Sequence, residues 1–373
     1  MSLVAFLDNS GHGPRGAVAP PDPRAAAFHL SMPGYAPSAV AEAPTAAAAL
    51  GLSRLVVKLE TERFGLPSFK VLGASWATCR ALSLRAGVPP AATLDELRRT
   101  CVRLDGLTLV AATDGNHGRA LAYMARLLAL DARILVPDGT AQARIDAIAG
   151  EGATVEIVPG SYDDAVARSA ALASDDHLVI SDTSWPGYER VPGWVADGYG
   201  TIFAELAEQL AGELPPLAAI QIGVGALASA AVRALAAPER VLVGVEPAGA
   251  DCALRAVRDG RPVLVPGPHR SIMAGLNCGR ASRVALPDMA GGIDAFCAIG
   301  DAAAEQAVRL LLQDGLRCGE TGASGVAGLL ALREDRPQRT WARLGLDDSH
   351  PAALAICTEA PTDPESFARI TAG

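Results

Sequence analysis

The stretch LTLVAATDGNHGRALAYMARLLAL, residues 107–130, contains three local patterns in succession. An apolar run of good strand formers, LTLVAAT (107–113), is followed by a polar turn, DGNHG (114–118). The next segment, RALAYMARLLAL, places its apolar residues at helical spacing. We therefore predict a strand, a tight turn and a helix, which together form the repeating unit of a parallel α/β sheet.

The same succession recurs along most of the chain. Upstream, RLVVKLE (54–60) alternates as a strand, and a helical run follows the turn-prone RFGLPSFK (63–70). Further strands are predicted in 132–138, 153–159, 240–247 and 352–357, helices near 141–150, 162–174 and 301–313, and a strand, glycine loop and helix in 217–235. Residues 1–40, rich in Pro, Gly and Ala, are predicted to form an irregular surface arm.

Strands that alternate with helices favour parallel, doubly wound sheets that are covered by helices on both faces. The length of 373 residues suggests about two domains, so we predict two α/β lobes. Ligands of such sheets bind at the carboxyl ends of the strands, where loops run into helix N-termini.

Composition limits the partners of the chain. Half of the residues are hydrophobic, 20% are charged, and the net charge is −9. Such an acidic chain repels nucleic-acid phosphates, so we do not expect a nucleic-acid partner. Of the 32 Lys and Arg residues, two are lysines, Lys58 and Lys70. Any chemistry that needs a lysine amine therefore has two candidates.

The seven cysteines are scattered and show no CxxC spacing, so the sequence predicts neither a disulfide framework nor a metal site. No charged segment followed by a long apolar run stands at the start, and no apolar run is long enough to cross a bilayer. We expect a cytoplasmic protein without a membrane partner.

The segment IGVGALAS (222–229) lies between a predicted strand and a predicted helix. Gly223 and Gly225 let backbone N–H groups approach an anion, and the start of the helix adds its dipole. A structural tight turn explains the pattern equally well, because the third glycine of a dinucleotide motif and the lysine of a P-loop are both missing.

Lys70 follows the turn LPSF at the start of a predicted helix. The positive end of the helix dipole and partial burial favour a neutral amine that can form a Schiff base. A solvated lysine on a helix surface is the alternative. Lys58 lies in an alternating strand and is better explained as a packing or ion-pair residue.

Polar residues follow two further predicted strands. Asp114 and Asn116 lie in the DGNHG turn, and Asp182 lies in ISDTSWPGYERVPGW (180–194). Asp and Asn are ordinary turn residues, because their side chains hydrogen-bond their own backbone. The functional interpretation is a loop that faces a cofactor, with the amide as a hydrogen-bond partner and two carboxylates as acids or bases on one substrate.

Seven segments occur in the order of a known family: FGLPSFKVLGAS, ATDGNHGRALAY, DTSWPGYERVPGW, GVGALA, GVEPAGADCALRAV, SIMAGLNCG and TGASGVAGL. Together they resemble diaminopropionate ammonia-lyase, a family of fold-type-II pyridoxal phosphate enzymes with threonine dehydratase and cysteine synthase as more distant relatives. The matches run from about Tyr35 to Thr362. The segments TDGNHG and DTSWPGY are the most specific to the ammonia-lyases.

The resemblance implies pyridoxal 5′-phosphate as cofactor and a set of residue roles. Lys70 would form the internal aldimine, and Asn116 would contact the ring hydroxyl. Asp114 would take the α-proton of the D substrate, and Asp182 that of the L substrate from the opposite face. The implied cofactor-binding residues are Lys70, Phe69, Asn116, Gly223, Val224, Gly225, Ala226, Leu227 and, at the pyridine nitrogen, Cys357 or Thr358.

The resemblance also implies an architecture and an activity. The large domain would be discontinuous (1–73 and 186–373), the small domain would cover 74–185, and the active site would lie in the cleft between them. The implied protein is a homodimer and a carbon–nitrogen lyase. It would convert D- and/or L-2,3-diaminopropionate, a small amino acid, by α,β-elimination into pyruvate and two ammonia.

Three departures from the family pattern keep other functions open. Ala323 in GASGV stands where we expect the glutamate of GESGA, Trp76 stands where tyrosine is usual, and TEAPTD (358–363) replaces a tail like TEGDT. One alternative is β-elimination or β-replacement on serine, threonine or another β-substituted alanine. A second is a non-catalytic binding protein of the same fold, against which the retention of Lys70 and both aspartates speaks.

Overall fold

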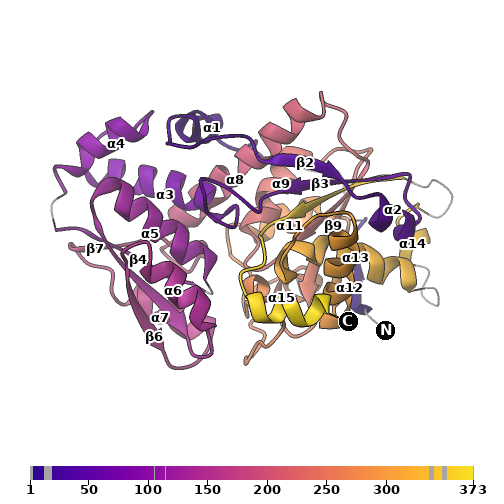
Figure 1. Cartoon of the computed structure of the whole chain (residues 1–373). Coiled ribbons are helices and arrows are strands. Elements are labelled where there is room, and N and C mark those ends of the chain that lie inside the picture. Colours follow the sequence, from indigo (N-terminus) through magenta and orange to yellow (C-terminus); the bar gives the residue numbers. More distant parts are fainter. Residues whose placement is uncertain are drawn as a thin grey trace.

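The computed structural model describes residues 3–11, 19–104, 106–113, 115–335, 340–346 and 351–372. Two lobes, each built around one sheet, make up the molecule (Figure 1). The larger sheet has seven strands in the order β1-β10-β9-β8-β11-β3-β2, and the smaller has four in the order β6-β5-β4-β7. The prediction of an α/β fold with two mainly parallel sheets is therefore confirmed.

The larger sheet consists of β1 (Leu3–Asp8), β2 (Ala39–Glu42), β3 (Arg54–Leu59), β8 (Leu217–Gln221), β9 (Val241–Pro247), β10 (Ala295–Ile299) and β11 (Ala352–Cys357). Its five central strands are parallel, and β1 and β2 pair antiparallel at the two edges. Alternate residues enter different cores: Ile220 and Ile356 join one, Ala219 and Ala355 the other. Because both faces are apolar, helices cover both.

Helices fall on the two faces according to which core they join. One face carries α8 (Arg190–Gln209), α9 (Ala226–Leu235), α10 (Cys252–Arg258) and α11 (Leu286–Gly292), and α1 (Pro23–Leu30) joins the same core by packing on α8 and on the first long helix of the smaller lobe. The other carries α2 (Pro44–Leu50), α12 (Asp301–Gln313), α13 (Glu320–Glu334), α14 (Thr340–Arg343) and α15 (Pro364–Thr371). Among the described residues, no helix combines the length and the apolar character that a bilayer span requires.

The smaller sheet is parallel throughout and consists of β4 (Thr108–Ala112), β5 (Asp131–Pro137), β6 (Thr154–Val158) and β7 (His177–Val179). Its lobe, at the left of Figure 1, also contains α3 (Lys70–Arg85), α4 (Leu94–Cys101), α5 (Asn116–Leu128), α6 (Gln142–Ala149) and α7 (Tyr162–Ala170). Helix α3 packs both on α5 and on α8 of the larger lobe, so one apolar core continues across the two lobes.

The predicted irregular arm is wrong in part, because two regular elements lie within residues 1–40 and a third begins at Ala39. Strand β1 pairs with β10, and β2 pairs with β3. Helix α1 begins with Pro23 and is capped by Asp22, whose side chain accepts a hydrogen bond from the Arg24 backbone N–H. Phe28 is fully buried in the shared core. These elements form through long-range pairing and packing, which local composition does not encode.

The cysteine spacing did not predict the disulfide that the structure contains. Cys318, just before α13, and Cys357, at the end of β11, form this disulfide. Their separation of 39 residues carries no pairing signal, and the fold alone brings the two elements together. The other five cysteines of the described residues are buried and are not part of this disulfide.

Lys58 behaves as the sequence predicted. Its side chain is fully buried, and its Nζ lies 2.7 Å from Oε2 of Glu205. Arg63 donates to the other oxygen of Glu205 at 2.7 Å and pairs with Glu60 at 2.6 Å. A closed network of charges therefore accounts for this lysine, which leaves Lys70 as the remaining candidate for chemistry.

Candidate active site

A cavity lies where β4, β8 and β11 end, and its wall draws on both lobes. The smaller lobe contributes Lys70, Ala112, Thr113, Asn116, His117, Tyr162 and Asp182; the rest of the wall is Phe69, Tyr199, Gln221, Gly223, Val224, Gly225, Ala226, Leu227, Gly275, Leu276, Cys278, Thr321, Thr358 and Glu359. The structure thus brings most of the predicted site residues together. Asp114 lies outside the described residues, and Cys357 does not line the cavity.

Lys70 is the first residue of α3, and its amine contacts the carboxylate that the sequence singled out. Lys70 Nζ donates to Asp182 Oδ2 at 2.8 Å, and the Tyr162 hydroxyl donates to Asp182 Oδ1 at 3.1 Å. Asp182 is almost fully buried, whereas the Lys70 side chain is 16% exposed. A lysine and two further polar groups therefore converge on one small volume.

The charge state of Asp182 follows from these neighbours. Burial by itself raises the pKa of a carboxyl group. The charge of Lys70, with smaller contributions from His117 and from the Lys70 and Tyr162 hydrogen bonds, outweighs burial and holds the pKa of Asp182 well below its usual range. Asp182 is therefore a carboxylate that can accept a proton as soon as its lysine partner is engaged elsewhere.

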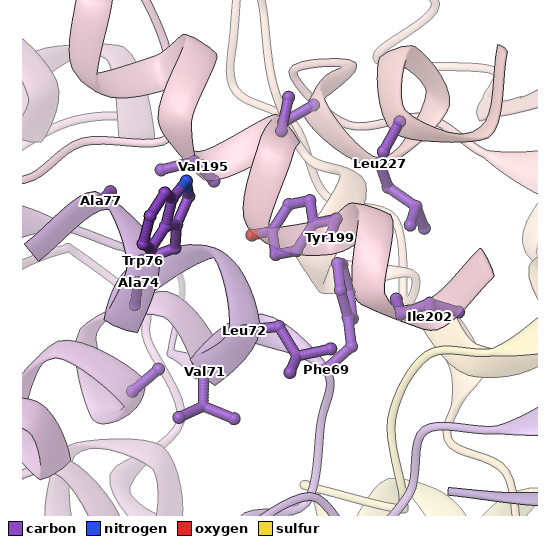
Figure 2. Close-up of a cluster of buried hydrophobic side chains, with 14 of the residues drawn as sticks. Phe69, Val71, Leu72, Ala74, Trp76, Ala77, Val195, Tyr199, Ile202 and Leu227 are labelled. Atoms are coloured by element: carbon purple, nitrogen blue, oxygen red, sulfur yellow. The ribbon is translucent and has the colours of Figure 1, made fainter. Parts of the chain in front are cut away.

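Close packing of α3 against α8 fixes the position of Lys70. A Cβ on Gly73 would lie 2.5 Å from the Tyr199 ring, and one on Gly198 would lie 2.4 Å from the Leu72 carbonyl oxygen. Figure 2 shows Phe69, Leu72 and Tyr199 gathered between the two helices. The Phe69 and Tyr199 ring centroids are 4.6 Å apart. The residues that precede and follow Lys70 are thus anchored in the core, which holds its backbone in place.

The glycine loop after β8 forms one end of the cavity. Gly225 has a φ of +102°, a conformation that side chains with a Cβ rarely adopt, and α9 begins directly after it. The first N–H groups of a helix have no acceptor inside the helix, and Ala226 and Leu227, which carry them here, line the cavity. This geometry favours the anion site over a merely structural turn.

The opposite wall ends at Thr358, just past β11. Gln221 Nε2 faces the carbonyl oxygens of Thr321, Gly322 and Ile356 at 3.2, 3.4 and 2.9 Å. Because carbonyl oxygens accept hydrogen bonds and never donate them, the NH₂ end of the Gln221 side chain must lie here. Gln221 Nε2 also donates to Thr358 Oγ1 at 2.9 Å. The Thr358 hydroxyl therefore accepts from Gln221, and its own hydrogen remains to be donated elsewhere.

Between the two residues predicted as alternatives at this position, the geometry favours Thr358. Cys357 is bonded to Cys318 and belongs to the core on the far face of the sheet. A half-cystine has no thiol hydrogen to donate, and strand alternation turns it away from the cavity. Thr358 is next in sequence, lines the cavity and carries a hydroxyl.

Asn116, the first residue of α5, faces the cavity from the smaller lobe. Its Nδ2 donates to Glu359 Oε2 across the opening. Glu359 in turn pairs with Ser68 in an isolated bridge, close to Lys70 in sequence. These two contacts of Glu359 therefore connect three parts of the cavity wall, namely the loop before α3, the end of β11 and the start of α5.

Sequence reasoning missed several residues of this wall. Gln221 is a polar side chain at the end of an otherwise apolar strand, which is a signal that was available. Tyr162 is the first residue of α7, and its hydroxyl donates a hydrogen bond to Asp182, which comes shortly after β7. No local pattern predicts this contact, because it depends on how α7 packs against the sheet.

One expected departure from the family pattern is wrong. In CGETGAS (318–324) the order Gly-Glu-Thr-Gly-Ala runs from Gly319 to Ala323, so Glu320 occupies the glutamate position of GESGA. Ala323 is the following alanine and is buried in the core. Trp76 is also a core residue, 1% exposed, with its ring centroid 5.9 Å from that of Phe28, and it does not line the cavity.

Comparisons with known proteins agree with this geometry. Residues 32–343 match the model of the family described as "Pyridoxal-phosphate dependent enzyme". The chain is 32% identical over 357 residues to the diaminopropionate ammonia-lyase of Escherichia coli strain K12, a match that covers 92% of this chain and 89% of the relative. The chain belongs to the diaminopropionate ammonia-lyase family. The ammonia-lyase of Salmonella typhimurium is 33% identical over 91% of this chain and 89% of its own length.

Solved structures show the same relationship. The crystal structure of the Escherichia coli diaminopropionate ammonia-lyase in complex with D-serine superposes with a TM-score of 0.89 at 29% identity. The match covers 99% of this chain and 97% of that one. The likeness therefore extends over both lobes, and this member of the family is a pyridoxal-phosphate-dependent enzyme.

The residues of the cavity fit that cofactor. The start of α9 offers N–H groups for a phosphate. Gly225, which precedes this helix, has little room for a side chain, because a Cβ there would lie 2.7 Å from Cε of Met289. Lys70 offers a primary amine, and Thr358 offers a hydroxyl whose hydrogen is directed away from Gln221. Backbone N–H groups for the phosphate, an amine for the aldehyde carbon and a hydroxyl for the pyridine nitrogen thus surround one cavity.

Proposed function

We propose that this protein is a diaminopropionate ammonia-lyase that converts D- and/or L-2,3-diaminopropionate into pyruvate and two ammonia. The contact of Lys70 Nζ with Asp182 Oδ2 at 2.8 Å supports the proposal most directly. It places an amine that can carry the cofactor beside a buried carboxylate that can take a proton from Cα. Asp182 lies within a segment that is specific to the ammonia-lyases, and the family membership of the chain agrees with this interpretation.

Each cofactor-facing residue has a role that follows from its chemistry. When bound, pyridoxal phosphate supplies a conjugated ring that takes up the electron pair left by the departing α-proton. We propose that Lys70 holds the cofactor through Nζ. The residues Gly223, Val224, Gly225, Ala226 and Leu227 hold the phosphate, and Phe69 and Asn116 orient the ring. The Thr358 hydroxyl, which accepts from Gln221, would be the donor toward the pyridine nitrogen.

The proton transfers fall to the two aspartates. Asp182 accepts the α-proton of the L isomer at a carboxylate oxygen, and the Tyr162 hydroxyl at 3.1 Å keeps that carboxylate oriented. As long as the Lys70 amine is charged and beside it, Asp182 has a depressed pKa and is a poor base. Whenever the Lys70 nitrogen is neutral or is displaced from Asp182, that charge no longer acts on the carboxylate, and Asp182 would be a stronger base. For Asp114 we propose the matching role toward the D isomer.

The direct test measures pyruvate and ammonia released from each isomer of 2,3-diaminopropionate by the purified enzyme loaded with pyridoxal phosphate. We expect product from at least one isomer. Lys70→Ala should abolish turnover and the long-wavelength absorbance of the bound cofactor, because no other described residue of the cavity wall is a lysine. Inactivity of the wild-type enzyme on both isomers would refute the proposal.

A second candidate is β-elimination from serine or another β-substituted alanine. It is favoured by the Escherichia coli relative, whose structure was solved in complex with D-serine. Rates on serine, threonine and β-substituted alanines, measured beside those on diaminopropionate, separate the two functions. A higher kcat/KM on serine than on diaminopropionate would establish the second.

We also propose that the lobes correspond to a large domain of residues 1–73 and 186–373 and a small domain of residues 74–185, with the active site in the cleft between them. The cavity wall supports a cleft that can open and close, because Asn116 and Asp182 belong to the proposed small domain and Thr358 belongs to the large one. A homodimer in the cytoplasm is expected from the family. Light scattering of the enzyme as it elutes from a size-exclusion column gives its molar mass and so tests the oligomeric state.

A further inference from the structure

Glu320, the first residue of α13, is a buried carboxylate that the roles proposed above do not use. The residue is 2% exposed. Among the described residues, Glu320 Oε1 has no hydrogen-bond partner, although it is shielded from solvent. A buried carboxylate oxygen without a partner is costly, so its retention calls for a ligand that supplies a donor.

Glu320 faces a second cavity that adjoins the catalytic one. This outer cavity measures about 980 Å³ and is enclosed by 137–144, 160–164 and 267–277 together with α13 and α15. Tyr162 lines both cavities, and Thr321, the neighbour of Glu320 in sequence, lines the catalytic one. Consecutive Cα atoms are about 3.8 Å apart, so the two cavities adjoin at Glu320 and Thr321.

Among the residues that the structure describes, no cationic side chain contacts Glu320 Oε1. The basic side chains that line the outer cavity are Arg144, Arg270 and His269. Arg144 donates to Thr362 Oγ1 at 3.1 Å, and His269 Nδ1 contacts the carbonyl oxygen of Gly249 at 2.9 Å. In the described part of the chain, none of the three forms an ion pair with Glu320. The dipole of α13, which is 15 residues long, further favours negative charge at this position.

We propose that Glu320 binds the side-chain ammonium of the substrate and so selects 2,3-diaminopropionate over serine. This inference rests on the proposed function. Once the α-amine of the substrate is engaged by the cofactor, its second amine is the remaining cation, and serine presents a neutral hydroxyl at the same place. A carboxylate forms a charge-assisted hydrogen bond with the ammonium and a weaker one with the hydroxyl.

The same contact assists the leaving group. A carboxylate beside the β-nitrogen keeps that nitrogen in its ammonium form. When the Cβ–N bond breaks, its electron pair leaves with the nitrogen, and neutral ammonia departs without a further acid. A serine hydroxyl has no such proton and would leave as hydroxide unless another group donated one. Glu320 therefore favours the diamino substrate both in binding and in elimination.

The test compares kcat/KM for 2,3-diaminopropionate and for serine in the holoenzyme of the wild type and of Glu320→Gln. Loss of one charge-assisted hydrogen bond should lower kcat/KM for diaminopropionate by about 10- to 100-fold. The value for serine should change by less than about 3-fold, because a neutral amide still hydrogen-bonds a hydroxyl. An equal change for both substrates, or no change for either, would overturn the inference.

Asp363→Asn is a matched control. Asp363 lines the same outer cavity, but its carboxylate already accepts a hydrogen bond from the Ser366 backbone N–H at 3.1 Å as the cap of α15. Asparagine caps helices equally well, so the variant removes one negative charge from the cavity without removing the cap. Its ratio of kcat/KM values should equal that of the wild type. A fall like that of Glu320→Gln would show a general charge effect and overturn the inference.

A binding measurement keeps the inference testable if Glu320→Gln fails to fold. The probes are 2,4-diaminobutyrate and homoserine, which differ by an ammonium in place of a hydroxyl and carry no leaving group on Cβ. Titration of the wild-type holoenzyme, followed through the absorbance of the cofactor, should give at least about tenfold tighter binding of 2,4-diaminobutyrate. Equal affinities would overturn the inference. Failure of the proposed function is distinguishable, because the wild type would then release no pyruvate from either diaminopropionate isomer.

Discussion

Replacing Thr358 by valine tests how the enzyme holds the pyridine end of its cofactor. The substitution keeps the shape of a side chain that is 2% exposed and removes its hydroxyl. Within the protein, the substitution removes the hydrogen bond that Gln221 Nε2 donates to Thr358 Oγ1 at 2.9 Å. Gln221 retains its bond to the Ile356 carbonyl oxygen at 2.9 Å, so no buried donor is orphaned. The free energy of unfolding should therefore fall by about 1 kcal/mol.

A second effect of similar size should be on cofactor binding. The Thr358 hydroxyl accepts from Gln221, so its hydrogen is available to the ring nitrogen. Loss of one such neutral hydrogen bond removes roughly 0.5–1.5 kcal/mol, which weakens the Kd for pyridoxal phosphate by about 2- to 13-fold. Titration of cofactor-free enzyme, followed by absorbance, gives the Kd, and denaturant unfolding gives the stability.

Two variants provide the controls. Thr358→Ser keeps the hydroxyl and should bind the cofactor as the wild type does. Cys357→Ser changes the preceding residue, which faces the opposite core, and should lower stability through the lost disulfide without shifting the absorbance of the bound cofactor. Wild-type affinity and absorbance in Thr358→Val would refute the reasoning, as would a larger loss of affinity in Cys357→Ser.

Three further predictions concern other parts of the structure. Asp182→Asn should lower kcat on L-diaminopropionate at least about 100-fold and spare the D isomer, because an amide cannot accept the α-proton; full activity on both isomers would contradict the role of Asp182. Gly225→Ala should weaken cofactor binding about tenfold, because a φ of +102° is strained for a residue with a Cβ. The control Gly291→Ala lies in open space at the end of α11 and should not weaken cofactor binding. Equal Kd values for the two variants would argue against the phosphate loop. Burial lowers the pKa of His29 to about 3, while its hydrogen bond to the Leu72 carbonyl opposes the shift. Below about pH 6.5, the unfolded chain therefore binds a proton at His29 that the folded protein does not bind. The stability that the neutral His29 contributes is complete above that pH and is lost as the pH falls toward 3. Denaturant unfolding should give about 2 kcal/mol less stability from this group at pH 5 than at pH 7, and His29→Gln should flatten that part of the profile.

Much of the fold follows from local pattern. The strand, turn and helix of residues 107–130 are present as β4 and α5, and the unit around Lys70 is present as β3 and α3. These segments were predictable because their hydrophobic period, turn residues and helix propensity agree with one another. The order β1-β10-β9-β8-β11-β3-β2 was not, since pairing partners up to about 300 residues apart leave no local trace.

Part of the candidate site was equally accessible from sequence. Lys70, Asn116, Asp182 and the glycine loop each stand where a strand runs into a helix, and parallel strands bring such places to one edge. Tyr162, Gln221 and Glu320 were not predicted. Their relevance depends on which hydrogen bonds their side chains make or lack after packing, and no spacing rule encodes that.

The two lysines show the division between sequence and tertiary structure. The sequence determined that either Lys58 or Lys70 must supply any catalytic amine, and arginine cannot replace it because a guanidinium stays charged at any working pH. The tertiary structure decided between them. It closes Lys58 into a buried ion pair with Glu205 and directs Lys70 toward Asp182 and a cavity. The physical reason is that the reactivity of an amine depends on the charges and solvent around it, which are determined by residues distant in sequence.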